Sequence, residues 1–423
     1  MSTTAWWLTA GFALMMALGV PFVFAIGLSV VAVLISVGIP DVLLPQTMIA
    51  STQSFSLLGI PFFMLAGELM SAGGLSRRLI SVADVLVRHL PGGMGHVTIV
   101  AAVIFAAISG SAPATTAAIG AIMIPAMVQR GYDAGYATAL SVSAGVLAPL
   151  IPPSIAFVIW GVIAEQSIAK LFASGVIPGL VMALSLMAVV VLRARYDRLP
   201  LAPRATWSEV KAALGGGKWA LLAPVIVLGG IYAGVFTPTE AAAVACFYSL
   251  AVGMWVEKRI TWSDLPGLFL AAMKVSAIVM AIIAVSGGFG VLVAQEQLAT
   301  KLAEYLSQTF EQKWLMLLVL NLGFFLLAAV MDEIAIMVIL GPMLIAIANK
   351  FSIDPIHFGA IIVTNVSIGM AAPPIGYCLF VGMAISGLSL GKVSKAIWPM
   401  VLAMLVVLML TTYVPAFSLF FHR

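Results

Sequence analysis

Two stretches of this chain decide its fold: IPAMVQRGYDAGYATALSVSAGVLAPLIPPSIAFVIWG at residues 124–161 and LGPMLIAIANKFSIDPIHFGAIIVTNVSIGMAAPPIGYCLFVG at residues 340–382. In each stretch an aspartate lies 19 residues before a double proline, and the two double prolines, Pro152-Pro153 and Pro373-Pro374, are 221 residues apart. A proline inside a helix removes a backbone donor and frees a carbonyl. The matched spacing therefore predicts an internal repeat in which each copy holds one long, broken helix.

The composition assigns the chain to the membrane. Of its 423 residues, 63% are hydrophobic and only 9% are charged, and the mean hydropathy is +1.17. Soluble domains are about 45–50% apolar and about 25% charged, so no water-soluble core of this length absorbs the surplus. These values exclude a soluble enzyme and a nucleic-acid-binding protein. The two cysteines lie inside apolar runs and the four histidines are scattered, which argues against a disulfide framework and a histidine metal site.

Apolar segments of about 20 residues are long enough to cross the hydrocarbon. We expect helices at 5–20, 22–38, 55–73, 94–110, 112–129, 134–163, 175–192, 219–236, 239–256, 273–294, 314–331, 333–349, 357–386 and 396–415. Gly19-Val20-Pro21 predicts a turn between the first two. The sequence Thr237-Pro238-Thr239-Glu240 fits a capping box at the start of a helix. Glu68 lies inside a span, and the sequence leaves open whether it reaches the membrane interface or has a function.

The positive charges predict the orientation of these helices. The polar stretch 193–218 holds six Lys or Arg residues, and we expect it to be the longest loop and to lie in the cytoplasm. The resulting topology places 15 of the 20 Lys and Arg residues inside and 5 outside. Segments 94–129 and 314–349 must then enter and leave on the same side. They are too apolar to be loops and predict re-entrant helical hairpins, whose tips must be buried in protein or face a water-filled cavity.

An amphipathic segment precedes each hairpin, and the two segments differ in charge. Residues 75–91 carry a net charge of +2, whereas residues 296–313 carry −1. One segment would lie inside and the other outside, as an inverted repeat requires. The alternative, that two membrane halves share Gly and Pro by chance, explains neither the spacing nor the charge.

The sequence thus predicts an all-α polytopic membrane protein of two inverted-topology repeats with re-entrant hairpins and discontinuous helices. We expect a first repeat at 1–192 (scaffold helices 5–73, arm helix 75–91, hairpin 94–129, broken helix 134–163), a cytoplasmic basic loop at 193–218, and a second repeat at 219–423 (scaffold helices 219–294, arm helix 296–312, hairpin 314–349, broken helix 357–386).

The first hairpin tip reads Ser109-Gly110-Ser111-Ala112-Pro113-Ala114-Thr115-Thr116. Its hydroxyls and freed carbonyls are hard oxygen ligands that suit an alkali cation, and the helix start beyond them presents amides to a carboxylate. The alternative is that Ser, Thr and Gly only pack membrane helices. A position at a hairpin tip favours the functional interpretation.

The second hairpin tip contains two adjacent acids, Asp332 and Glu333. Intramembrane acids are costly and mark functional sites. Asp332 is the better candidate for a cation ligand, whereas Glu333 either caps the next helix or faces water. The double prolines Pro152-Pro153, followed by Ser154, and Pro373-Pro374 free carbonyls that a bound cation can satisfy. Asn365 can offer an amide oxygen toward the same place.

Several motifs, taken in order, resemble a known family. They are GIPFFMLAGELMSAGGLSRRLI (59–80), ISGSAPATTAAIGAIMIPAM (108–127), IPPS (151–154), GVFTPTEAAAVA (234–245), MDEIA (331–335) and IDPIHFG (353–359). Together they resemble the large membrane subunit of tripartite ATP-independent periplasmic (TRAP) transporters, over essentially the whole chain. Each motif alone is weak evidence, and the ordered set is specific.

The resemblance implies a function that composition does not show. Such subunits take up organic acids, including C4-dicarboxylates and sialic acids, through the bacterial inner membrane. They use a sodium gradient, a periplasmic solute-binding protein that delivers the acid, a small four-helix membrane subunit and an elevator mechanism. Here that small subunit would be a separate chain, which we expect on the scaffold surface formed by 5–73 or 219–256.

Carried onto this chain, the family's motifs imply two sets of site residues. The substrate set is Ser109, Gly110, Ser111, Pro153, Ser154 and Pro374. The sodium set is Ser109, Ser111, Thr115, Pro152, Asp332, Asn365 and Pro373. The family usually has a threonine just before its second double proline, whereas Ala371-Ala372 stand here, which removes one hydroxyl ligand from the second ion site.

Three other functions stay open at this stage. A stand-alone sodium–dicarboxylate symporter would need no binding protein. An intramembrane enzyme would need a nucleophile–base or metal constellation, and the sequence displays none. A passive pore would transport without saturation or sodium dependence. We therefore expect a secondary transporter and no enzyme, with sodium as a coupling ion and no prosthetic group.

Overall fold

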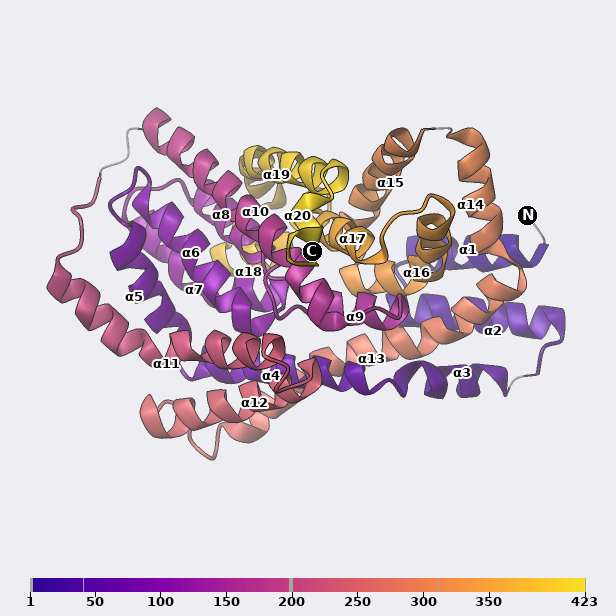
Figure 1. Ribbon diagram of the computed structural model, residues 1–423, viewed down its shortest axis with the longest axis horizontal. Helices are drawn as coiled ribbons and strands as arrows, with labels where there is room; N and C mark the ends of the chain where they lie inside the picture. The colour runs from indigo at the N-terminus through magenta and orange to yellow at the C-terminus, as the bar shows by residue number, and fades with distance from the viewer. Residues whose placement is uncertain (1–2, 41, 198–200, 311, 423) are drawn as a thin grey trace.

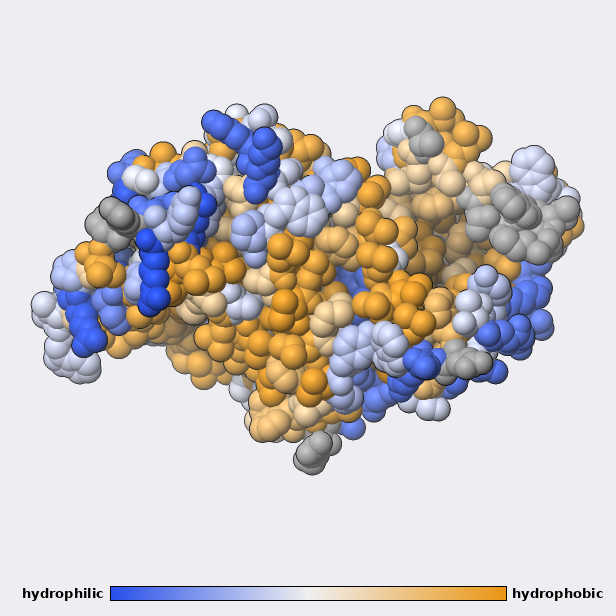
Figure 2. Space-filling view, turned by 90° about the horizontal axis from the view of Figure 1, so that it is seen from above, coloured by the Kyte–Doolittle hydropathy of each residue, from blue (hydrophilic) through white to orange (hydrophobic). Residues whose placement is uncertain are grey.

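The computed structural model describes residues 3–40, 42–197, 201–310 and 312–422, which form helices and no strands. Eight of the helices in this part of the chain are long and apolar enough to cross a membrane. Figure 2 shows polar side chains at the two ends of the long axis and a broad apolar surface between them. The prediction of an all-α polytopic membrane protein is confirmed.

The first half begins with two short helices and one long helical segment. These are α1 (Thr3–Ala17), α2 (Phe22–Val37), α3 (Leu43–Thr52), η1 (Phe55–Leu58) and α4 (Gly59–Ala72). The predicted turn between α1 and α2 is confirmed, with Gly19 in the left-handed region at φ 78°. The segment expected to begin at residue 55 has α3 directly before it. The sequence predicts no helix at the position of α3, because residues 46–54 contain Gln, Ser and Thr.

An arm helix, a helical hairpin and a broken helix follow. They comprise α5 (Leu75–Val87), α6 (Gly93–Ser109) with α7 (Ala112–Gln129), and α8 (Ala134–Gly145) with α9 (Ile155–Ile163). The second half repeats this order with α14 (Leu298–Thr309), α15 (Lys313–Ala328) with α16 (Glu333–Lys350), and α17 (Pro355–Gly369) with α18 (Tyr377–Ser386). The helix breaks lie at both double prolines, where the sequence places them. Residue 311, in the predicted second arm helix, lies outside the described residues.

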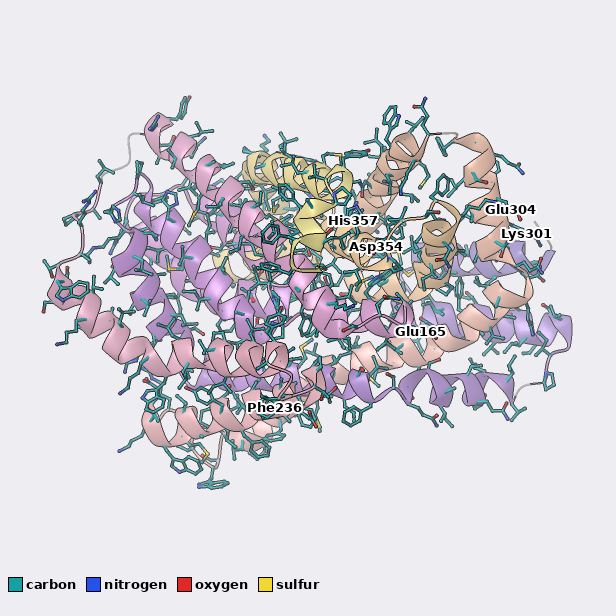
Figure 3. All side chains as sticks on the ribbon, viewed as in Figure 1. Glu165, Phe236, Lys301, Glu304, Asp354 and His357 are labelled. Atoms are coloured by element: carbon teal, nitrogen blue, oxygen red, sulfur yellow. The ribbon has the colours of Figure 1, made fainter. Side chains whose placement is uncertain are left out.

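Aspartates start the first segment of each broken helix. Asp133 accepts a hydrogen bond from the Tyr136 backbone N at 2.8 Å, and Asp354 accepts from the Ile356 and His357 backbone N at 2.9 and 3.0 Å. Figure 3 shows Asp354 beside His357 at the start of α17. These N-caps satisfy amides that the helix itself leaves free.

The basic stretch 193–218 is not the predicted long loop. The helix α10 (Ile168–Tyr196) runs into it, and α11 (Trp207–Tyr232) begins just after its middle. A capping box between Thr206 and Glu209 starts α11, and the following Lys, Ala and Leu residues are strong helix formers. Residues 198–200 lie outside the described part of the chain. The remaining helices are α12 (Pro238–Ala251), η2 (Val252–Val256), α13 (Leu265–Gln295), α19 (Leu390–Tyr413), α20 (Ala416–Leu419) and η3 (Phe420–His422).

The helices form two packed groups. In one, α4 contacts α12 and α13, and α13 also contacts α2 and α3, along the lower edge of Figure 1. In the other, α7, α8, α10, α17, α18 and α19 pack together above them. Each arm helix contacts a hairpin helix and a scaffold helix. The first arm helix, α5, contacts α6 of its hairpin and α11, and the second, α14, contacts α16 of its hairpin and α13. Figure 1 places α5 near one end of the long axis and α14 near the other.

Candidate functional site

A cavity of about 720 Å³ lies between the two groups of helices. Its wall includes Ser109 and Ser111 of the first hairpin tip and Asp332 and Glu333 of the second. It also includes Ile155, which follows the first double proline, and residues of α4 and α13. Residues more than 200 positions apart in the sequence thus meet at one place, as the repeat predicts.

The first hairpin tip turns at Gly110. Its φ of 59° lies in the left-handed region, and an added Cβ would collide with the carbonyl oxygen of Pro153. Only glycine fits both demands without strain. Beside the turn, the hydroxyls of Ser109 and Thr115 are hydrogen-bonded at 2.8 Å. Both side chains are buried, so the tip presents hydroxyl oxygens in a fixed arrangement.

Each broken helix is joined to the hairpin tip of its own half by backbone hydrogen bonds. The Ile155 amide donates to the Gly110 carbonyl at 3.3 Å, and the Gly376 amide donates to the Ala329 carbonyl at 2.9 Å. Both double prolines carry a cis peptide bond. Ser154 caps α9 by accepting from the Phe157 backbone N at 3.3 Å. Both halves therefore join the hairpin tip to the broken helix through a backbone hydrogen bond.

At the second hairpin tip the helix cap is Asp332 and not Glu333. Asp332 is the cap of α16, since its Oδ1 accepts from the Ile334 backbone N at 3.0 Å. Glu333 does not cap a helix: the residue is 5% exposed, lies in the cavity wall, and its Oε2 finds no hydrogen-bond partner among the described residues. Either of two adjacent acids can cap the same helix, and the turn geometry selects Asp332 here.

The predicted site residues divide into three positions. Ser109, Ser111 and Asp332 form part of the cavity wall. Gly110, Thr115, Pro153 and Ser154 lie directly behind it and contact the tip or cap α9. Pro152, Pro373 and Pro374 belong to the loops that break the helices, and they are not part of the cavity wall.

Asn365 lies away from the cavity wall, in a polar network that the sequence reasoning missed. Its Nδ2 donates to the backbone O and Oδ1 of Asn321 at 2.9 and 3.0 Å, and Asn321 Nδ2 donates to Thr412 Oγ1 at 2.8 Å. The Asn365 Oδ1 has no partner in the described structure. The signal for this network was an asparagine in the otherwise apolar helix at 314–331.

The fold and cavity define a class of protein. A multi-pass helical membrane protein with two hairpin tips and two broken helices around a shared cavity has the architecture of a membrane transporter permease. The chain also matches the family described as "Tripartite ATP-independent periplasmic transporter, DctM component" over residues 9–417, and it belongs to this family. It is therefore a TRAP large permease and a multi-pass protein of the bacterial inner membrane.

Named relatives extend this comparison. The chain is 41% identical over 419 residues to the isethionate TRAP transporter permease protein DctMQ of Oleidesulfovibrio alaskensis, covering 97% of this chain and 65% of that protein. It is 42% identical over 369 residues to the C4-dicarboxylate TRAP transporter large permease protein DctM of Pseudomonas aeruginosa (87% and 86%). It is 38% identical over 400 residues to the 2,3-diketo-L-gulonate TRAP transporter large permease protein YiaN of Escherichia coli (94% of each). The match thus spans somewhat less than two thirds of the isethionate permease.

Proposed function

We propose that this chain couples sodium entry to the uptake of an organic acid, with both ligands bound in the cavity between the hairpin tips. The observation that carries the proposal is the meeting of Ser109, Ser111 and Asp332 in one cavity wall. The names of the three relatives described above refer to small organic acids or their anions.

The chemistry of the cavity suits an anion at the first tip. Helix α7 begins at Ala112, and α9 begins at Ile155 on the same wall. The free amides and the partial positive charge of a helix start favour a carboxylate. The hydroxyls of Ser109 and Ser111 add donors beside these amides.

The second tip suits a sodium ion. Asp332 supplies a carboxylate, and Val330 and Met331 supply backbone carbonyls outside the helices. No three His, Cys, Asp or Glu side chains are grouped as metal ligands in the described residues. A hard alkali cation is bound by oxygen ligands such as the Asp332 carboxylate and the backbone carbonyls beside it. Thr115, Pro152, Asn365 and Pro373 lie outside the cavity wall and stay proposed members of the sodium set, with Thr115 acting through Ser109.

The arrangement of helices supports an inverted repeat with an elevator motion. Both halves carry the same tip-to-loop hydrogen bond, and the two arm helices lie at opposite ends of the long axis. In this proposal α6–α9 and α15–α18 move together along the layer formed by α2–α4 and α11–α13. The cavity lies at the boundary between these two parts.

A small membrane subunit and a periplasmic binding protein complete the proposed system. The described surface of α11 and α12 exposes Phe247 and Val225 with exposed fractions of 74% and 64%. A helical partner in the membrane would cover such side chains, and we place the small subunit there or on α1–α4.

Reconstitution tests the proposed function. The chain is placed in liposomes with and without the small subunit and binding protein, and uptake of labelled C4-dicarboxylate, isethionate and 2,3-diketo-L-gulonate is measured under an inward sodium gradient. We expect saturable uptake that needs sodium and all three proteins. Equal uptake by the chain alone would indicate a stand-alone symporter, and uptake that ignores the sodium gradient would contradict the proposal.

A further inference from the structure

A second cavity, of about 390 Å³, adjoins the central one between α4, α5 and α7. The two cavities share Gly67, Glu68, Ala114 and Ala117 as wall residues. The second cavity is lined further by Arg77 and Arg259, which the charge distribution predicts to be cytoplasmic. It therefore lies next to the central cavity on its predicted cytoplasmic side.

The charges of this second cavity favour an anion. Arg77, Arg259 and Glu68 are its charged wall residues, so two positive side chains face one negative side chain. Within the described chain neither arginine forms a salt bridge, although the neighbouring Arg78 pairs with Glu257 at 3.0 Å. Guanidinium groups without a carboxylate partner are ready donors for a planar carboxylate.

The turn before α5 leaves room for the side chain of Arg259. Gly74 adopts φ 78°, and a Cβ added there would lie 2.5 Å from Arg259 Cδ and 2.8 Å from its Nε. The absence of a side chain at Gly74 thus lets Arg259 lie against the start of α5. Arg77 is in the first turn of that helix, so both arginines are at the positive end of its dipole.

A buried hydroxyl without a partner borders the second cavity. Ser76 lies in the wall of the second cavity with an exposed fraction of 3%, and its Oγ has no hydrogen-bond partner in the described residues. Buried polar groups without a partner are costly. The hydroxyl is closed off from the cavity in this conformation, and a ligand oxygen would pair with it once the Ser76 side chain turned toward the cavity.

We propose that Arg77, Arg259 and Ser76 form a cytoplasmic anion site, which receives the carboxylate of the transported acid after it leaves the central cavity. The identity of the ligand rests on the proposed function, whereas the preference for an anion rests on the cavity itself. A carboxylate that moves between the cavities passes Glu68 and then meets two arginines. The acid would thus be released to the cytoplasm from a site that is distinct from the sodium-dependent central cavity.

Cysteine labelling tests the anion preference without transport. Ser71 is exposed in the wall of the second cavity, Ser263 is exposed outside it, and the native Cys246 and Cys378 are buried. Ser71→Cys and Ser263→Cys are labelled with an anionic and a cationic methanethiosulfonate. We expect the anionic-to-cationic rate ratio at position 71 to exceed that at position 263 by about fivefold or more, and succinate or sulfate to slow labelling at position 71 alone.

Neutral variants then assign the preference to the arginines. Arg77→Gln with Arg259→Gln should lower the ratio at position 71 to that at position 263, whereas Lys258→Gln, which removes one positive charge next to Arg259, should leave it high. Equal ratios at both positions, or a ratio that survives loss of both arginines, would overturn the proposal. Conversion of Ser76→Ala should weaken protection by succinate without changing the ratio for the free reagents.

Counterflow separates this site from the proposed function. The double arginine variant should raise the half-saturation concentration for acid on the inner face by roughly three- to tenfold and leave the outer value unchanged. Normal sodium-driven uptake with no anion preference at position 71 would reject the site alone. An anion preference without any sodium-driven uptake would reject the proposed function and keep the site.

Discussion

Replacement of Gly110 by alanine gives the sharpest test of how the first hairpin tip is built. Gly110 combines a left-handed backbone with a close approach of the Pro153 carbonyl. A left-handed conformation costs an L-residue about 1–2 kcal/mol. A methyl group forced against a packed backbone costs about 1–3 kcal/mol more. The sum is about 2–5 kcal/mol, and the least costly response is to move the tip away from the Pro153 loop.

A second left-handed glycine serves as a control that isolates the cost of the close contact with Pro153. Gly131 is also left-handed, with φ 86°, but an added Cβ there meets nothing within 4 Å. Gly131→Ala should therefore cost only the backbone strain, about 1–2 kcal/mol. The two variants therefore differ by the cost of the contact with Pro153, about 1–3 kcal/mol. If this energy displaces the tip, Gly110→Ala should transport roughly 5- to 150-fold more slowly than Gly131→Ala.

Two measurements are needed for this comparison. Thermal unfolding of the purified variants gives the order of stability, which should be wild type, Gly131→Ala and then Gly110→Ala. Uptake into proteoliposomes, corrected for the amount of folded protein, gives the transport rate. If Gly110→Ala unfolds at the same temperature as Gly131→Ala and transports as fast, the close approach to Pro153 does not hold the tip in place.

The other predictions concern the second tip, the polar network and one helix cap. Asp332→Ala should abolish sodium-driven uptake in a folded, inserted protein, while Asp354→Ala, which removes an equivalent cap distant from the cavity, should cost about 1 kcal/mol of stability and leave uptake intact. Wild-type uptake by Asp332→Ala would remove this carboxylate from the ion site. Asn321→Leu leaves the Asn365 and Thr412 side chains without a shared partner and should lower stability by about 1–3 kcal/mol in thermal unfolding, whereas Asn349→Ala on the surface should be near neutral. Thr237→Ala removes a capping box and should cost about 1 kcal/mol, with uptake per folded molecule unchanged; a lower uptake would give this residue a role beyond starting α12.

Features set by local chemistry could be predicted from the sequence. The double prolines break both long helices because their missing amides and ring sterics act wherever they occur. The box at Thr237 and Glu240 starts α12 as predicted, because both partners lie within one turn. The meeting of the two hairpin tips followed from the repeat, since equal elements in both halves predict that the tips share one location.

Features set by tertiary contacts could not be predicted. Arg193 and Arg195 sit in the last turn of α10, where a charge-rich stretch resembles a loop in sequence and is in fact helical. The burial of Glu333 depends on how α16 packs on its neighbours. The pairing of Asn365 with Asn321 joins helices from different elements. In each case the deciding partner is distant along the chain.

The unequal chemistry of the two tips gives the proposed coupling a physical basis. The tip at Ser109 and Ser111 is uncharged, whereas the tip at Asp332 and Glu333 carries acids on the same cavity wall. A carboxylate substrate in this cavity is repelled by an ionised Asp332, and two unit charges about 4 Å apart interact by about 1–4 kcal/mol for effective dielectric constants between 80 and 20. A sodium ion on Asp332 cancels this repulsion and would strengthen substrate binding by roughly 5- to 800-fold. By linkage, the bound acid strengthens sodium binding by the same factor, so neither ligand would be carried efficiently alone. Two identical neutral tips would provide no such dependence, and for this reason the proposed coupling requires the departure from symmetry at Asp332.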